Sequence, residues 1–184
     1  MKSMKRLRRT LFGMMVLLGL MPCLARAEAV EHVVHQVKLR CEGEFRSAAR
    51  FQRTADTQPG NPVRKMISDI CVHEGMEITI ARTEYMPETK MDLKGFVKQS
   101  AAALGRRAGV TNPMQSTAAV KVSSMPAERM SFSARLNAKP VTVESLYFLK
   151  DQTLWTVQIV FETGEERRTQ AERILSGVRY QAEP

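Results

Sequence analysis

The sequence has few of the residues from which enzyme active sites are usually built. Its 184 residues include only three histidines and three cysteines, and 6% are aromatic. It contains no H-E-x-x-H metal motif, no C-x-x-C pair, no G-x-S-x-G turn and no glycine-rich phosphate loop. A serine or cysteine nucleophile needs a base beside it, and three histidines leave little choice of base. We therefore expect a protein that is not an enzyme and that carries no cofactor and no metal.

The charge of the chain is unevenly distributed. The formal net charge is +9, from 28 Lys+Arg and 19 Asp+Glu. The first 27 residues contain no acid and six of the basic residues, namely Lys2, Lys5, Arg6, Arg8, Arg9 and Arg26. Without these six, 22 basic residues face 19 acids, which is a net charge of +3 over the remaining 157 residues. This ordinary balance gives no support to nucleic-acid binding.

The first 27 residues have the three parts of a secretory signal peptide. A basic stretch over 2–9 precedes an apolar run over 11–20, which is too short to span a bilayer. Ala25-Arg26-Ala27 then provides an A-x-A cleavage site. We predict cleavage between Ala27 and Glu28, and a mature protein of bacterial type over 28–184. It would be periplasmic or secreted, with no integral membrane segment after cleavage.

Signal cleavage changes the cysteine count. Cys23 leaves with the signal peptide, so Cys41 and Cys71 remain in an oxidising compartment. We predict a disulfide between them that closes a loop of the 29 residues 42–70, and chain entropy assigns such a loop about 3–4 kcal/mol of stabilisation. A redox-active pair is the alternative. The absence of the C-x-x-C spacing makes the structural role the better prediction.

Apolar periodicity predicts one α+β domain with a twisted antiparallel sheet flanked by helices. A helix is expected to begin at Asp92, because the apolar residues from Leu93 to Leu104 follow helical spacing. A second helix is expected over 165–180, and residues 28–36 are expected to form a loosely ordered lead-in. Alternating patterns predict strands over 37–41, 67–72, 76–81, 117–122, 129–136, 141–149 and 154–161.

Three segments together resemble the Mog1/PsbP-like superfamily. Residues 125–129 (Met-Pro-Ala-Glu-Arg) are similar to the start of one of its strands, and the hairpin over 141–149 and 154–161 is similar to its central pair. Residues 174–179 (Ile-Leu-Ser-Gly-Val-Arg) resemble the end of its last helix. The resemblance covers roughly 70–180 and implies an α/β/α sandwich that binds other proteins rather than catalysing a reaction. No functional residue of the family can be matched here, and Cys41 and Cys71 are not one of its hallmarks.

The remaining titratable residues suggest two weaker sites. His32 and His35, with Glu28 and Glu31, could form a metal site if the lead-in were helical, and His73-Glu74 is the other histidine context. Solvated histidines are the simpler interpretation, because a tight site needs three or four converging ligands. The basic pairs form the second suggestion, a positive patch for an acidic partner or lipid headgroups at Arg106, Arg107, Arg167 and Arg168. Interleaved acids near the second pair favour a solvated helix surface.

The leading hypothesis is therefore an exported, non-catalytic protein that binds another protein of unknown identity. An inhibitor or immunity-type protein is one alternative. A small-ligand carrier or a small hydrolase, with a pocket between sheet and helices, is another. A hydrolase is less expected because no acid lies in an unusually apolar segment.

Overall fold

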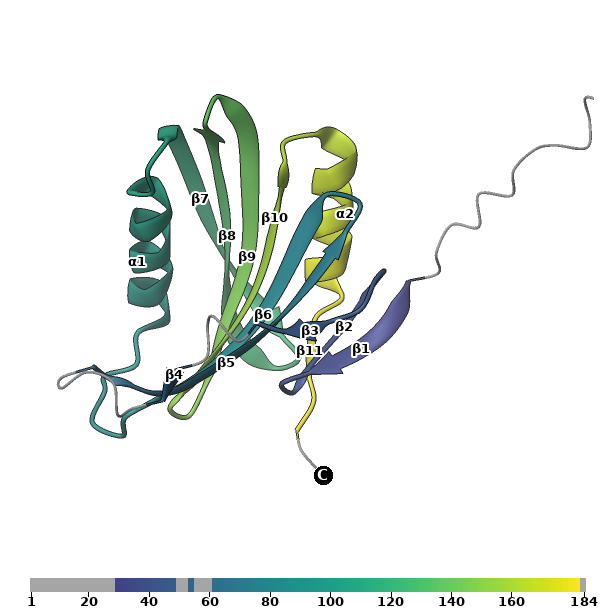
Figure 1. The fold of residues 1–184 in the computed structure, drawn as a ribbon. Coiled ribbons are helices and arrows are strands. Elements are labelled where there is room, and N and C mark those ends of the chain that lie inside the picture. The colour runs from purple at the N-terminus through teal and green to yellow at the C-terminus, as the bar shows by residue number, and fades with distance from the viewer. Residues whose placement is uncertain (1–28, 49–52, 55–60, 183–184) are drawn as a thin grey trace, which may run out of the picture.

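The computed structural model describes residues 29–48, 53–54 and 61–182 of the chain (Figure 1). The predicted signal peptide and its cleavage site between Ala27 and Glu28 lie outside the described residues. Neither of the two described helices is long and apolar enough to cross a bilayer.

Two antiparallel sheets and two helices make up the described fold (Figure 1). A small sheet has the order β1-β2-β11, and a large sheet has the order β3-β5-β6-β10-β9-β8-β7, with β4 paired to β5. The small sheet consists of β1 (Val30–Val34), β2 (Val37–Cys41) and β11 (Arg179–Tyr180). The large sheet consists of β3 (Arg46–Ser47), β4 (Arg53–Thr54), β5 (Val63–His73), β6 (Met76–Tyr85), β7 (Val110–Val122), β8 (Met125–Leu136), β9 (Lys139–Lys150) and β10 (Thr153–Glu162). The helices are α1 (Leu93–Gly105) and α2 (Glu165–Ser176).

The helices cover opposite faces of the large sheet, as Figure 1 shows. Successive side chains of a strand point to opposite faces, and β9 shows this clearly. Leu146 and Phe148 belong to the core under α2, whereas Val143 and Tyr147 belong to the core under α1. The α2 core is the larger of the two because β2 and the apolar face of β10 (Trp155, Val157, Ile159 and Phe161) also contribute to it. The result is the predicted α+β domain with one helix on each face.

The predicted strands and the first helix are confirmed, with some boundaries extended. Asp92 is the residue before α1, as expected, but its side chain makes no cap hydrogen bond. Strand β7 begins at Val110, well before the expected start at 117, because it pairs with β8 along most of that strand's length. Pairing with β8 thus extends β7 through residues 110–116, where the apolar alternation in the sequence is weak.

Two predictions at the ends of the mature chain are wrong. The expected lead-in over 28–36 contains β1, which pairs with β2, and the backbone oxygen of His35 accepts a 2.8 Å hydrogen bond from Trp155 Nε1. The second helix ends at Ser176 and not at 180, and Arg179–Tyr180 then pairs with β2. Val178 is buried, as predicted, although it lies beyond the helix. Both differences arise from contacts between chain ends, which sequence periodicity does not report.

Candidate functional site

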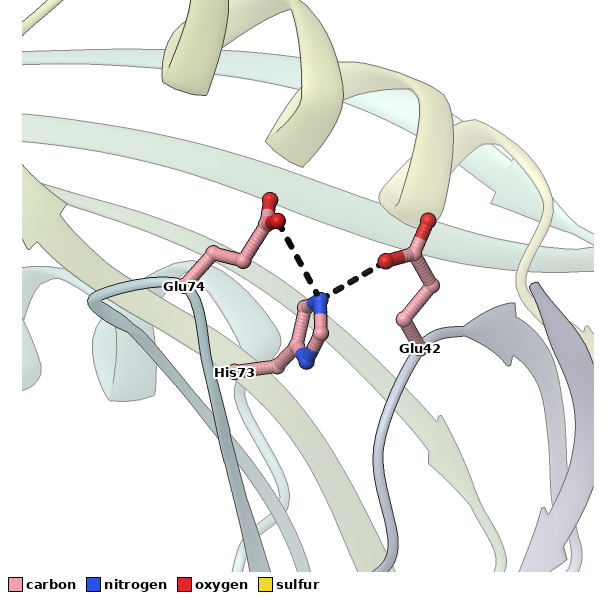
Figure 2. Close-up of side chains that lie close together, drawn as sticks. All are labelled: Glu42, His73 and Glu74. Atoms are coloured by element: carbon pink, nitrogen blue, oxygen red, sulfur yellow. Dashed lines mark ion pairs between the residues drawn. The ribbon is translucent and has the colours of Figure 1, made fainter. Parts of the chain in front are cut away.

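One group of three potential metal ligands lies in the described part of the chain, at Glu42, His73 and Glu74. Glu42 follows β2, His73 ends β5, and Glu74 lies in the turn to β6. Figure 2 shows both carboxylates directed at the same ring nitrogen. The distances from His73 Nε2 are 2.7 Å to Glu42 Oε2 and 3.9 Å to Glu74 Oε1. The sequence places His73 beside Glu74 but gives no sign of Glu42, which tertiary folding supplies.

This group is better suited to an ion pair than to a metal. Structural zinc sites normally have four ligands, whereas only three groups converge here, and the Glu74 side chain is 69% exposed. A protonated His73 would pair with both carboxylates. We therefore interpret the group as an ion-pair contact that connects the end of β2 to the β5–β6 turn.

The metal site considered for the first strand does not form. His32 packs edge-on against the ring of Phe45, with ring centroids 5.3 Å apart. The Nε2 atom of His35 lies 3.5 Å from Asp69, and Glu31 pairs with Lys38 at 2.8 Å. Each side chain therefore has a different neighbour, and Glu28 lies outside the described residues. His32 lies on β1 and His35 in the turn that follows, so the two are not on one face as they would be in a helix.

Cys41 and Cys71 lie side by side but are free thiols in the structure, so their disulfide remains a prediction. Both are buried, their side chains are hydrogen-bonded to each other, and Cys71 Sγ also contacts the backbone oxygen of Glu42 at 3.4 Å. Burial raises the pKa of the Cys41 thiol to about 12, and the adjacent Cys71 adds to the shift. Burial also raises the pKa of Cys71. A reduced pair would thus be protonated and unreactive at neutral pH.

The glycine after this pair is required by its surroundings. Gly43 has a φ of +90°, and a Cβ atom there would lie 2.8 Å from Cys71 Sγ. Any other residue would therefore be strained and would displace the sulfur. The backbone is fitted closely around the two cysteines.

The four arginines considered as one positive patch are divided between the two faces of the sheet. Arg106 and Arg107 follow α1, and Arg167 and Arg168 belong to α2. Because α1 and α2 cover opposite faces (Figure 1), these two pairs cannot form a single patch. Arg167 lies against Gly75, and Arg168 lines a cavity beside α2.

Glu144 is the most buried acid among the described residues, and it was not anticipated from the sequence. The side chain of Glu144 on β9 is 3% exposed, and it accepts hydrogen bonds from Arg129 Nε and Nη2 at 3.3 and 3.1 Å. Ser131 Oγ donates to its other oxygen at 2.7 Å. Arg129 also lies 3.5 Å from Glu172 of α2. Both carboxylate oxygens of Glu144 are thus engaged, which indicates a structural role.

The expectation that no acid lies in an apolar segment is therefore wrong for Glu144. The signal was present in the alternation of residues 141–149, where Glu144 shares a face with Leu146 and Phe148. An acid at an inward position of a strand needs a buried partner. The partner, Arg129, could be identified only once β8 was known to pair with β9.

The free edge of the large sheet is a long, exposed strand of the described fold. Strand β7 ends the sheet order, and every residue over 111–121 is exposed. Lys121 is the only charged residue in that segment, and Met114 is 74% exposed. Sheet edges are usually protected by charges, prolines or bulges. Here Pro113 and the irregular pairing between Thr111 and Met114 affect only the start of the strand.

Two grooves flank this edge, one on each face of the sheet. The α1 groove, a cavity of about 440 Å³ between α1 and β7–β8, receives Gln115, Thr117 and Ala119 from β7. The α2 groove, a cavity of about 300 Å³, includes Ser116 and Ala118. Gln115 and Ala119 thus open onto one groove and Ser116 and Ala118 onto the other, as the pleat requires, while Thr117 contributes to both. The remaining lining residues are Lys94, Val97, Lys98, Ala101 and Glu128 in the α1 groove, and Thr117, Arg129, Ser131, Glu144, Arg168 and Glu172 in the α2 groove.

Comparison with solved structures identifies the fold. The chain is similar to cyanobacterial PsbP (CyanoP) from Synechocystis sp. PCC 6803, with a TM-score of 0.52 and 7% identity over 89% of this chain and 99% of that one. LpqN, involved in cell envelope biogenesis of Mycobacterium tuberculosis, gives a TM-score of 0.42 and 13% identity over 84% of this chain and 86% of its own. No model of a protein family and no curated protein matches the sequence. The likeness to CyanoP confirms the predicted Mog1/PsbP-like fold.

Proposed function

We propose that this PsbP-like chain is an exported, non-catalytic protein that binds another protein, and that the partner adds a strand to β7. The observation that carries the proposal is the open edge of the large sheet. An exposed edge presents unpaired backbone N–H and C=O groups to a second chain. Strand addition uses these groups for affinity and uses alternate side-chain pockets for specificity.

The continuous part of this edge is long enough for such a contact. From Met114 to Lys121 the pairing of β7 with β8 is regular, so the outer side of these eight residues is a regular template. The segment contains no acid and only one base, so charge repulsion does not restrict the added strand. The grooves on either face provide the side-chain sites.

The proposed site of action, outside the cytoplasm, is supported by the sequence. The three-part leader over 1–27 supports export, and the neighbouring cysteines at 41 and 71 fit an oxidising compartment. An inhibitor or immunity-type role is a narrower form of the same proposal, since it also requires a protein partner.

A carrier or hydrolase receives less support from the described residues. Small-molecule sites are usually concave and mostly apolar, whereas charged and polar side chains dominate the linings of both grooves beside β7. Glu144 is held by Arg129 and Ser131, which leaves it no free oxygen for acid–base chemistry.

The test is affinity capture with the oxidised mature protein 28–184 from a native envelope fraction and from culture medium. Two edge variants, Ser116→Pro and Thr117→Pro, are compared with the wild type. Adjacent residues of an edge strand alternate in whether their backbone groups face the neighbouring strand or solvent. One variant should therefore remove only an outward N–H group and keep its thermal stability.

We expect one protein to be recovered in near-stoichiometric amount by the wild type and lost with the stable proline variant. Equal recovery by the wild type and by that folded variant would contradict strand addition while supporting a binding function. Recovery of no protein from either source would contradict the binding function itself.

A further inference from the structure

The side chain of Glu128 lines the α1 groove and has no partner in the described chain. Glu128 lies on β8 and is 8% exposed, yet its side chain makes no ion pair or hydrogen bond with any described residue. It stands directly between Ala119 of β7 and Tyr147 of β9 in the sheet register. The Tyr147 hydroxyl is likewise buried without a hydrogen-bond partner among the described residues.

We propose that the α1 groove receives a long basic side chain, above all arginine, from the strand that adds to β7, and that Glu128 binds it. This inference rests on the proposed function and specifies the chemistry of the partner. It assigns a specificity role to a residue that the mature fold leaves unsatisfied.

Charge and burial together select a base rather than an acid. Glu128 is only 8% exposed, so its negative charge is partly shielded from bulk water and attracts a cation more strongly than a charge at the open surface would. Lys94 and Lys98 line the same groove and would attract an acid, but both are exposed residues of α1. Ion pairs of exposed lysines contribute little, because water and salt screen them.

The geometry of the sheet selects a long side chain. Neighbouring strands are about 4.8 Å apart, so a strand added to β7 would lie roughly 10 Å from β8. A serine or threonine on the added strand is too short for that span, whereas arginine and glutamate can meet across it. Ala119 lies between them in the register and leaves the path open because its side chain is a single methyl group. The guanidinium group also matches a carboxylate in a two-pronged hydrogen bond.

The probes for this inference are three fluorescein-labelled nine-residue peptides that differ at one position. They share the sequence Ser-Val-Thr-Val-X-Val-Thr-Val-Ser with blocked ends, where X is arginine, citrulline or glutamate. Citrulline has nearly the shape of arginine without its charge. Binding is measured by fluorescence polarisation to the oxidised mature protein, to Glu128→Gln, and to Glu162→Gln. The last variant is a matched control because it removes one negative charge at an exposed position at the end of β10.

We expect the arginine peptide to bind the wild type at least about tenfold more tightly than the citrulline peptide. Glu128→Gln should abolish that difference, and Glu162→Gln should retain it. Methylation of alternate backbone nitrogens in the arginine peptide should weaken binding for one of the two alternating sets only, because a paired strand directs only alternate N–H groups at its neighbour.

Three outcomes would overturn the inference: tighter binding of the glutamate peptide, an unchanged preference in Glu128→Gln, or no binding of any peptide up to millimolar concentration. The capture experiment separates these from failure of the proposed function. A partner captured by the wild type and equally by Glu128→Gln would leave the binding function intact and exclude Glu128 as its receptor.

Discussion

At the scale of single residues, the two buried carboxylate side chains of the sheet differ in whether they have a hydrogen-bonding partner. Glu144 is held by Arg129 and Ser131, whereas Glu128 on the opposite face has no partner among the described residues. Both face inward from central or near-central strands, where an unpaired carboxylate is costly. The first arrangement is therefore expected to stabilise the mature fold, and the second is the place where a partner would contribute.

The hydrogen bonds of Glu144 should be measurable in the stability of the protein. We predict that Glu144→Gln lowers the free energy of unfolding by about 1–3 kcal/mol, because charge-assisted hydrogen bonds are weakened and Arg129 keeps only the exposed Glu172 as an ionic partner. Urea denaturation measures the change. A double variant with Arg129→Met should regain part of the loss. An unchanged midpoint for Glu144→Gln would show that this ion pair contributes nothing.

His35 should make stability depend on pH below neutrality. Burial lowers its pKa below the ordinary 6.5, and Arg82 and Lys65 act in the same direction, while the nearby Asp69 carboxylate opposes the shift without outweighing it. The unfolded chain therefore binds a proton near pH 6.5 that the folded chain does not bind. Stability due to this residue is present above pH 6.5 and is lost as the pH falls below it.

The prediction for His35 is a shallower pH dependence in His35→Gln than in the wild type. The free energy of unfolding is measured by urea denaturation at intervals between pH 7.5 and 5.0, a range chosen around the ordinary histidine pKa of about 6.5. Equal slopes for the two proteins over this range would contradict a lowered pKa for His35.

At the scale of elements, the cysteines connect parts of the chain that no strand pairing joins. Cys41 ends β2 in the small sheet, and Cys71 belongs to β5 in the large sheet. The ion pair of His73 with Glu42 connects the same two regions, one residue after Cys41 and two residues after Cys71 (Figure 2). The two contacts together hold the small sheet against the α2 side of the domain.

We predict that oxidised mature protein contains the Cys41–Cys71 disulfide and that a reductant lowers its free energy of unfolding by about 3–4 kcal/mol. The reason is that the bond restricts the unfolded chain over residues 42–70. Urea denaturation with and without dithiothreitol measures the effect, and Cys41→Ser should be insensitive to the reductant. Two free thiols found in the unfolded, unreduced protein would contradict the prediction.

At the scale of the whole molecule, the α/β/α arrangement leaves one long edge of the sheet open. α1 and α2 cover the two faces (Figure 1). One groove beside β7 is lined in part by residues of α1 and the other in part by residues of α2. An exported protein built in this way would meet its partner after the leader has been removed. The position of cleavage therefore defines the first residue of the mature protein that would bind the partner.

Removal of the leader is predicted to produce a mature protein that begins at Glu28. Substitution Ala27→Arg should prevent cleavage, because signal peptidase accepts small residues at that position. Intact-mass spectrometry of the exported protein distinguishes 28–184 from the full chain, and Glu28→Gln serves as a control that should still be cleaved. An exported wild-type protein that retains residues 1–27 would show that the prediction is wrong.

Local sequence patterns determined the elements of this fold. The helical spacing from Leu93 to Leu104 and the alternation over 141–149 and 154–161 gave α1, β9 and β10 because periodicity directly reports which side of an element is buried. The class of fold followed from the order of these elements. Only the tertiary structure decided which elements are neighbours. The side-chain contacts between elements depend on that arrangement.

The pairing of Glu144 with Arg129, the meeting of Glu42 with His73, and the burial of Glu128 each join residues on different strands. The separation of the two arginine pairs and the position of β7 at the edge depend on strand order and on the placement of the helices. A repeating pattern of apolar residues specifies which face of a strand is buried, but it carries no information on which strand lies beside it.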